Sequence, residues 1–183
     1  MKKVFLLLLI GFLNFGNYAF SSEETIKALK KGGKIIFIRH AIAPGNGDPD
    51  NINLKDCNTQ RNLSKEGIKQ SEKIGKFFRD NKIEIDKILS SEWCRCKDTV
   101  KEMKIGKWKT FSGLNSFFQG YSNKDEVLKK LNKKLSSTKN NELVLMVTHQ
   151  VVILNITGIA PPSGGIVIYN SQTRQSKQIN IEY

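Results

Sequence analysis

The sequence predicts an α/β fold, a three-layer sandwich in which a largely parallel central sheet is flanked by helices. Short runs of β-branched and aromatic residues, such as 34–38 and 143–147, indicate strands that are buried on both faces. These runs alternate along the chain with amphipathic helical patterns, which is the order that builds parallel sheets. A length of 183 residues allows one such domain. We therefore expect a single sheet with helices on both faces.

The elements are expected at regular intervals along the chain, with turn-forming residues between them. In chain order they are a helix at 22–31, a strand from 34 that ends at Arg39-His40, a long loop at 41–61, a helix from 65 to about 80, a strand at 83–89, a helix from about 93 to 103, a short strand at 107–111, an irregular segment at 114–123, a helix at 125–135, a strand at 143–147, a helix at 149–157, and a closing hairpin of strands at 166–169 and 175–181. The loop at 41–61 is long enough to predict a functional role.

The helix expected from residue 65 has the clearest local signals. Ser64 is a typical N-cap, and Glu66 lies where the positive end of the helix dipole favours a carboxylate. The apolar positions on one face of this helix are Ile68, Ile74, Phe77 and Phe78. We expect this stripe to pack against the sheet.

The first residues are typical of a secretory signal peptide. Lys2 and Lys3 precede an almost wholly apolar run at 4–13, and a polar region follows that ends near Ala19. The apolar run is too short to span a bilayer comfortably, so a cleaved signal is favoured over a membrane anchor. We expect residues 1–19 to be removed and residues 20–183 to form a single domain, periplasmic or secreted, without a stable membrane anchor.

Export changes the interpretation of the three cysteines, because an oxidising compartment favours disulfides and an odd count leaves one thiol over. Cys57 lies in the long polar loop, whereas Cys94 and Cys96 flank Arg95. A Cys-x-Cys pair without a second pair or a nearby histidine lacks a usual zinc ligand set, so we expect no metal site. We predict that Cys57 is bridged to Cys94 or Cys96, with Cys96 favoured. The alternative is three buried thiols.

The strong positive charge indicates anionic partners. Removal of residues 1–19 takes away two lysines and no acids, which leaves 28 basic and 17 acidic residues, a net charge of +11 instead of +13. Many of the lysines are scattered over predicted helix faces, where they are typically solvated. Because they are not interleaved with stacking aromatic residues, we expect no nucleic-acid partner. Neither the net charge nor any motif in the sequence indicates an oligomeric state.

Both histidines of the chain follow predicted buried strands. His40 comes at the end of the first strand, directly after Arg39, and His149 comes after the strand at 143–147. Open α/β sheets bind ligands in the crevice at the carboxyl ends of their strands. The structural alternative is that each histidine is a satisfied polar residue at a strand end. The shared setting of the two favours an active site.

Two imidazoles and several arginines in one crevice suit phosphoryl transfer. A neutral imidazole is a competent nucleophile, and guanidinium groups bind phosphate oxygens in pairs. Arg39 beside His40 would neutralise the phosphoryl group, and Arg95 would add a second fork, so that neither a metal nor another cofactor is needed. The sequence has no nucleophile elbow, no P-loop and no dinucleotide-binding glycine pattern. A cysteine nucleophile at Cys94 or Cys96, paired with His149, is disfavoured in an oxidising compartment.

Four segments together resemble the histidine phosphatase superfamily, whose fold is called phosphoglycerate mutase-like. Arg39-His40-Ala41, with Asn46 following, resembles the Arg-His-Gly-x-x-x-x-Asn signature. The segment 62–70 is similar to a Leu-Thr-x-x-Gly-x-x-Gln helix start, and 90–99 to a Ser-x-x-x-Arg-Ala-x-x-Thr element. Thr148-His149-Gln150 stands where the family has Gly-His-Gly. The ordered match spans about residues 33–170, and together with the predicted signal peptide it suggests an exported bacterial member of this family.

The resemblance implies a role for each matching residue. His40 would be the nucleophile that forms a phosphohistidine, Arg39, Arg95 and His149 would surround the phosphate with His149 donating in its protonated form, and Asn46 would add a contact. Arg61 of the loop is either a further phosphate contact or a solvated arginine. The expected substrate is a small phosphorylated or anionic compound, and the expected activity is that of a phosphoric monoester hydrolase.

The chain departs from the family at the proton donor. The mutase-like branch has a glutamate in a Leu-x-Glu segment, where this chain reads Leu114-Asn115-Ser116, and the acid-phosphatase branch has an aspartate where this chain has Gln150. A missing acid would favour leaving groups that depart without protonation, including phosphohistidine. The alternatives are an acid supplied by Asp48, Asp50, Asp56 or Glu92, or a non-catalytic binder of phosphorylated or anionic envelope ligands.

Overall fold

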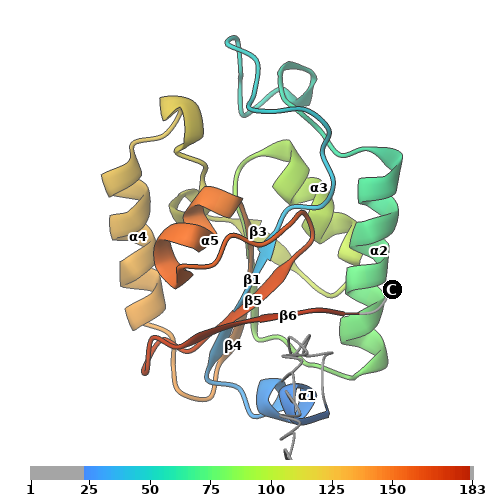
Figure 1. Cartoon of the computed structure of the whole chain (residues 1–183), viewed down its shortest axis with the longest axis vertical. Helices are drawn as coiled ribbons and strands as arrows, with labels where there is room; N and C mark the ends of the chain where they lie inside the picture. The colour runs from blue at the N-terminus through green and yellow to red at the C-terminus, as the bar shows by residue number, and fades with distance from the viewer. Residues whose placement is uncertain (1–22, 182–183) are drawn as a thin grey trace, which may run out of the picture.

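The computed structural model of the protein describes residues 23–181, which form a mixed sheet with helices on both faces (Figure 1). The helices are α1 (Glu23–Lys30), α2 (Lys65–Asp80), α3 (Cys94–Met103), α4 (Lys124–Ser136) and α5 (Gln150–Thr157). The strands are β1 (Lys34–Arg39), β2 (Lys87–Ser90), β3 (Trp108–Thr110), β4 (Leu143–Thr148), β5 (Ile166–Tyr169) and β6 (Ser176–Ile179). The predicted signal peptide, residues 1–19, lies outside the described residues. Within 23–181, no helix has the length and apolar character needed to cross a membrane.

The six strands of the described chain form one sheet in the order β3-β2-β4-β1-β5-β6. Strands β3, β2, β4 and β1 are parallel, and the predicted closing hairpin of β5 and β6 is antiparallel. The α/β class is therefore confirmed, and the sheet is parallel in four of its six strands. In the centre, β1 pairs with β4 so that Arg39 lies opposite Thr148. This register places the residues after both strands side by side.

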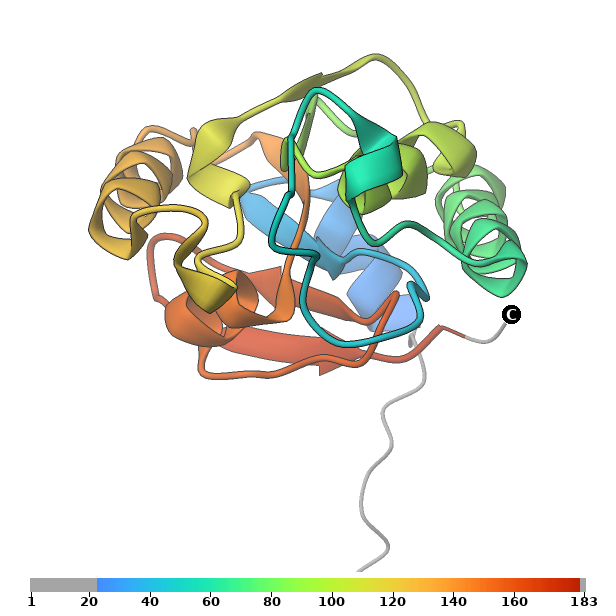
Figure 2. The same cartoon turned by 90° about the horizontal axis from the view of Figure 1, so that it is seen from above.

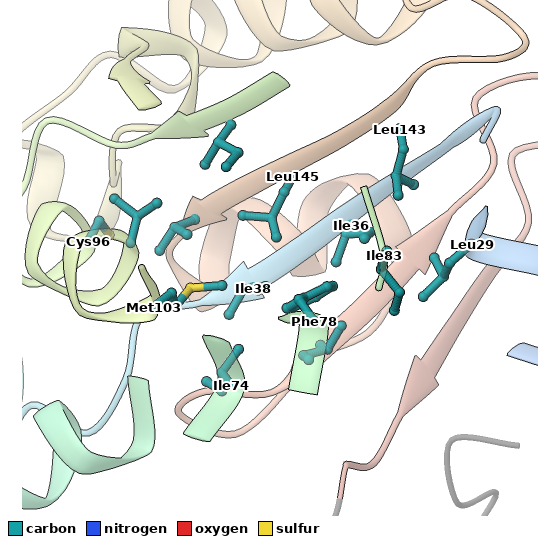
Figure 3. Close-up of a cluster of buried hydrophobic side chains, with 14 of the residues drawn as sticks. Leu29, Ile36, Ile38, Ile74, Phe78, Ile83, Cys96, Met103, Leu143 and Leu145 are labelled. Carbon is teal, nitrogen blue, oxygen red and sulfur yellow. The ribbon is translucent and has the colours of Figure 1, made fainter. Parts of the chain in front are cut away.

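Two apolar cores lie on the two faces of the sheet, as the alternation of side chains along β1 requires. Helices α1, α2 and α3 cover one face, where Ile36 and Ile38 pack with residues such as Ile74 (Figure 3). Helices α4 and α5 cover the other face, where Ile35 and Phe37 point. Seen from above, α4 and α2 lie on opposite sides of the sheet (Figure 2).

Helix α2 begins as the sequence predicts, with the Ser64 side chain accepting a hydrogen bond from the Gly67 N–H. Gly67 itself permits close approach to the loop after β1, because a Cβ at this position would lie 2.1 Å from the carbonyl O of Ile42. The predicted inner stripe of this helix was wrong at one position. Ile68 is 40% exposed, whereas Ile74 and Phe78 are buried. The buried stripe of the helix begins at Gly67 and continues through Ser71, and Ile68 lies at its edge, about 100° round the helix from Gly67.

The predicted second strand is shorter than the sequence indicates, because residues 83–86 have no neighbouring strand. Pairing begins at Lys87, which lies opposite Val144 near the start of β4. Just before it, the Asp86 carboxylate accepts a hydrogen bond from the Leu143 N–H. The apolar pattern of this segment therefore reflects burial of Ile83 in the core as well as strand formation.

The disulfide joins Cys57 to Cys94, and the preference for Cys96 was wrong. Cys94 is the first residue of α3 and faces the loop, whereas Cys96 lies two residues on, about 200° round the helix. Cys96 is consequently buried as a free thiol, and its Sγ lies 3.5 Å from Nε2 of His149. The bridge ties the loop after β1 to the helix that carries Arg95.

Reduction of this bridge is expected to lower the melting temperature. It closes a loop of 37 residues in sequence, for which chain entropy gives about 4 kcal/mol of stabilisation. In a domain of this size that corresponds to a decrease of roughly 8–16 °C on addition of a reductant. Calorimetry with and without reductant measures the decrease. The matched control is the Cys57→Ala/Cys94→Ala variant, which should not respond to the reductant. An unchanged melting temperature of the reduced wild-type protein would contradict the estimate.

Candidate active site

The parallel strands bring the two histidines together at one edge of the sheet. His40 follows β1 and His149 follows the neighbouring strand β4, and the His40 N–H donates to the carbonyl O of Thr148 at 2.9 Å. The two rings lie with their centroids 5.5 Å apart, and each residue is only 3% exposed. The third strand, β2, ends beside β4 and leads through Ser91 to Arg95 on α3.

The protonation of the His40 ring follows from its surroundings. Nδ1 lies 2.9 Å from the carbonyl O of Ala41, which can only accept a hydrogen bond. Nδ1 therefore carries the proton, and Nε2 keeps its lone pair. Burial, followed by the charge of Arg95, lowers the pKa of His40 well below its ordinary value of 6.5. His40 is thus a neutral imidazole with a nucleophilic nitrogen.

His149 has the opposite tautomer. Its Nδ1 lies 3.4 Å from Nη2 of Arg95, which can only donate, so the ring proton is on Nε2. Nε2 lies 2.9 Å from Oγ of Ser91, and that hydroxyl donates to Oδ1 of Asn115 at 3.1 Å. Asn115 in turn donates to Glu92. Burial, followed by the charge of Arg95, lowers the pKa of His149 well below 6.5. In this structure His149 is neutral, rather than protonated as the sequence analysis expected.

A pocket of about 200 Å³ opens beside the two rings. All six residues predicted for the site line it: Arg39, His40, Asn46, Arg61, Arg95 and His149. The remaining lining residues are Gly47, Ser116, Phe118, Gln150 and Val151. The pocket therefore combines two neutral imidazoles with three guanidinium groups, a setting suited to an anion.

Two buried guanidinium nitrogens in this pocket lack partners. Nη1 of Arg39 donates to the carbonyl O of Pro161 at 3.1 Å, and the terminal nitrogens of Arg95 bind Asp48, but within the described part of the chain neither Nε has a hydrogen-bond partner. A buried unsatisfied donor costs about 1–3 kcal/mol. Two such donors on residues that line one pocket indicate a binding site for an oxyanion. Among residues 23–181, no group of His, Cys, Asp and Glu side chains is arranged to hold a metal ion.

Arg61 and Asn46 occupy different parts of the pocket wall. Nε of Arg61 donates to the carbonyl O of Gly47 at 2.7 Å, and its Nη1 donates to the carbonyl O of Ala43. Arg61 therefore braces the loop and lines the pocket, so it is not the solvated loop arginine that the sequence left open. Asn46 is exposed and lies at the rim.

The pocket has no carboxylic acid among its described lining residues. Of the four acids considered as proton donors, Asp48 is paired with Arg95, and Glu92 accepts from Asn115. Asp50 and Asp56 do not line the pocket either. Ser116, which stands at the position of the family's glutamate, lines the pocket and is 4% exposed. The family's proton-donating carboxylic acid, which is missing from the sequence motifs, is therefore not replaced by another acid in the described pocket lining.

The cysteine-nucleophile alternative does not suit this geometry. Cys94 is held in the disulfide, and burial raises the pKa of the Cys96 thiol to about 12. A thiol with such a pKa is not ionised near neutral pH, and the thiolate is the reactive form. Cys96 contacts the His149 ring, but as a buried, protonated thiol it does not serve as a nucleophile.

Sequence reasoning missed three polar residues that hold the pocket's histidines and the segment after His40 in place. Ser91 orients His149, and Asn115 continues that chain of hydrogen bonds. Oγ1 of Thr99 accepts the Ala41 N–H at 2.9 Å and so fixes the backbone directly after His40. Ser91 and Thr99 lie inside the motif that carries Arg95. Their places in that motif, close to Arg95 in sequence, could have indicated that they lie near the site.

Acidification is expected to destabilise the protein through the two histidines. In the folded protein they stay neutral well below pH 6.5, whereas in the unfolded chain they become protonated near that value. Below pH 6.5 the unfolded state therefore binds more protons, and the free energy of unfolding falls by up to about 2.7 kcal/mol per pH unit. The lowered pKa of Asp48 costs stability only at pH values near and below 3.8. Urea unfolding between pH 7 and pH 5 measures the slope, and His40→Gln should halve it. A stability that does not change over this range would contradict the assignment.

Comparisons with known proteins agree with this geometry. A sequence model of the histidine phosphatase superfamily (branch 1) matches residues 35–116, a range that contains Arg39, His40 and Arg95. No curated protein matches the chain in sequence.

Several solved structures share the fold. A protein histidine phosphatase SixA complexed with tungstate is 16% identical over 79% of this chain and 93% of its own, with a TM-score of 0.54. A putative phosphohistidine phosphatase SixA from Agrobacterium tumefaciens is 18% identical over 81% of this chain and 96% of its own, with a TM-score of 0.56. A phosphoserine phosphatase mutant from Entamoeba histolytica is 15% identical over 80% of this chain and 95% of its own, with a TM-score of 0.52. Together with the paired histidines at the strand ends, these findings show that the chain has the phosphoglycerate mutase-like fold of these phosphatases, and that its residues 35–116 match the histidine phosphatase superfamily.

Proposed function

We propose that the protein is a metal-independent phosphatase that acts through a phosphohistidine at His40. The observation that carries the proposal is the free Nε2 of His40 in a pocket whose arginines have unpartnered, buried N–H groups. The match of residues 35–116 to the histidine phosphatase superfamily supports a hydrolase of the phosphatase type.

The reaction proceeds in two displacements. The lone pair on Nε2 of His40 attacks phosphorus, the bond from phosphorus to the leaving group breaks, and the leaving group takes that electron pair. Nδ1 keeps its proton and donates a hydrogen bond to the carbonyl O of Ala41, which stabilises the positive charge that develops on the ring. Water then attacks phosphorus, the P–N bond breaks with its electron pair returning to Nε2, and inorganic phosphate leaves with the oxygen and protons of that water. The guanidinium groups of Arg39 and Arg95 stabilise the charge on the transferring oxygens in both steps.

A dianionic phosphoryl group changes the protonation of the site. Opposite charge nearby favours the protonated form of an imidazole, so a bound phosphoryl group would raise the pKa of His149. His149 would then take a proton on Nδ1 and donate it as a hydrogen bond to a phosphoryl oxygen. The hydrogen-bond chain through Ser91 holds the ring while this happens.

The substrates are phosphoryl compounds whose leaving groups depart without protonation. The absence of a carboxylic acid from the described pocket lining supports this class. Phosphohistidine and phosphate esters of acidic alcohols or phenols belong to it. Two of the solved structures that share the fold are named as a protein histidine phosphatase and a putative phosphohistidine phosphatase, which agrees with this class. We also propose that the protein works in the periplasm or outside the cell, in keeping with the predicted signal peptide and the Cys57–Cys94 disulfide.

Trapping the phosphoenzyme tests the proposal. Wild-type protein is mixed with a chromogenic aryl phosphate, quenched in alkali within one turnover, and analysed by mass spectrometry for phosphate on histidine. Phosphate is stable on histidine in alkali, and it should be found on the peptide that contains His40. Turnover without a phosphorylated His40 would refute the mechanism, and no turnover of any phosphoryl compound would refute the activity.

The second candidate is a non-catalytic binder of phosphorylated or anionic ligands, and the missing acid also favours it. A binder would take up inorganic phosphate or an aryl phosphate without releasing product. Calorimetric titration combined with a phosphate-release assay on the same sample separates the two functions.

A further inference from the structure

Asp48 forms the most enclosed ion pair of the site. Its Oδ1 and Oδ2 accept hydrogen bonds from Nη1 and Nη2 of Arg95 at 2.7 and 3.0 Å, and both side chains are 4% exposed. The same carboxylate accepts from Nε1 of Trp93 at 3.1 Å and from the Arg61 N–H at 3.2 Å. Burial raises the pKa of Asp48, but these hydrogen bonds and the charge of Arg95 outweigh it, so that the pKa is lowered. Asp48 is therefore an ionised carboxylate with its acceptor positions in use.

The surrounding structure holds Asp48 in place independently of this ion pair. Oε1 of Gln119 accepts the Asp48 N–H at 2.8 Å, and the Tyr121 hydroxyl donates to the carbonyl O atoms of Asp48 and Pro49. The Cys57–Cys94 disulfide fastens the other end of the loop to α3. Asp48 is thus a fixed part of the loop. It does not line the pocket and does not occupy the place of a ligand.

The ion pair determines which edge of Arg95 remains for a ligand. A guanidinium group has two edges that bind an oxyanion through paired N–H groups, one formed by Nη1 and Nη2 and the other by Nε and Nη2. Asp48 occupies the first edge. On the second edge, Nε has no partner within the described residues, and Nη2 lies 3.4 Å from Nδ1 of His149. Asp48 therefore holds one of the two forks of Arg95, and the other remains for phosphate.

We propose that Asp48 is the positioning residue of Arg95: it holds the Nη1–Nη2 edge so that the Nε–Nη2 edge is presented to the phosphoryl group beside His149. The proposal rests on the proposed function for its kinetic consequence. The binding geometry itself can be tested without turnover. Asp48 also offsets one of the three guanidinium charges that line the pocket, which leaves an excess of two for a phosphoryl dianion.

Nitrogen NMR of the arginine side chains tests the geometry. The chain has five arginines, so their Nε–H signals can be assigned with single Arg→Lys variants. On titration with inorganic phosphate, the Nε signals of Arg39 and Arg95 should shift in the wild-type protein, whereas those of Arg79 and Arg174 should not. In Asp48→Asn, the Arg39 signal should still shift and the Arg95 response should be lost. An Arg95 signal that ignores phosphate in the wild type, or responds equally in Asp48→Asn, would overturn the proposal.

Kinetics then separate positioning from loop stability. Asp48→Asn keeps the size of the side chain but places an amide against a guanidinium donor, so kcat for an aryl phosphate should fall by about 10- to 100-fold. KM should change by less than about threefold, because Arg39 and Arg61 still hold the dianion. The double variant Asp48→Asn/Arg95→Lys should lose no more than Arg95→Lys alone, since Asp48 acts through Arg95.

Tyr121→Phe is the matched control. It removes the hydroxyl that bonds to the backbone of Asp48 and Pro49 but leaves the carboxylate and Arg95 intact. Its kcat should stay within about twofold of wild type, while its melting temperature decreases.

Additive losses in the double variant, or an equal loss of kcat in Tyr121→Phe, would show that Asp48 serves loop stability only. An increase of kcat in Asp48→Asn would show an internal competitor for phosphate and would also overturn the proposal. A wild-type protein without turnover would refute the proposed function and leave the NMR test intact.

Discussion

His40→Gln is expected to lower kcat/KM for a chromogenic aryl phosphate by about 10³-fold or more, because removal of a nucleophile eliminates the covalent route. Glutamine keeps a polar side chain of similar length, and its amide can still donate to the carbonyl O of Ala41 in place of Nδ1. Initial-rate kinetics on purified protein measure the loss.

Phosphate affinity is the control for this variant. The guanidinium groups of Arg39 and Arg95 are untouched, so calorimetric binding of inorganic phosphate should remain within about tenfold of wild type. Lost turnover with retained binding would locate the defect in chemistry. Turnover equal to that of the wild-type protein would remove His40 as the nucleophile.

The second large effect concerns the leaving group. General acid catalysis typically contributes about 10²- to 10⁴-fold, and the described pocket lining holds no carboxylic acid. We therefore expect kcat/KM for an aryl phosphate with an acidic phenol to exceed that for an alkyl phosphate by about 10³-fold or more. Release of inorganic phosphate from a graded series of aryl and alkyl phosphates measures this dependence.

Ser116→Glu should weaken that dependence. Ser116 lines the pocket at the position where the mutase-like branch has its glutamate, so the new carboxyl group could protonate an alkoxide as it departs. Alkyl phosphate turnover should rise by about tenfold or more, with little gain for the most acidic phenols. Ser116→Gln is the matched control, since it has the same size and cannot act as an acid. An equal rise in both variants, or a wild-type enzyme indifferent to the leaving group, would refute the assignment.

Much of the fold could be predicted from local pattern. The N-cap at Ser64 and the apolar run of β4 are signals contained within a few residues, and the structure confirms both. The meeting of His40 and His149 could also be predicted, because parallel strands end at the same edge of a sheet. What local pattern does not contain is the path of a long loop. The partner of Cys57 depends on which side of α3 that loop crosses, and this led to the wrong preference for Cys96.

The acids of the loop show the same limit. In the sequence Asp48 is one of several carboxylates without a partner, and it could be considered a proton donor. Only the folded loop brings it against Arg95 and Trp93, where it becomes a fixed counter-ion. The partnership between Ser91 and Asn115 was hidden for a similar reason, since 24 residues separate them.

The Cys57–Cys94 bridge has a practical consequence for any assay of this protein. Material produced in a reducing cytosol would carry every residue of the pocket but would lack the covalent tie between the loop with Asp48 and the helix with Arg95. Poor activity of such a preparation would reflect the missing Cys57–Cys94 disulfide, and would not show that the pocket residues lack phosphatase activity. Thiol titration of the denatured chain distinguishes the two forms, because the bridged form has only Cys96 free, whereas the reduced form has all three cysteines.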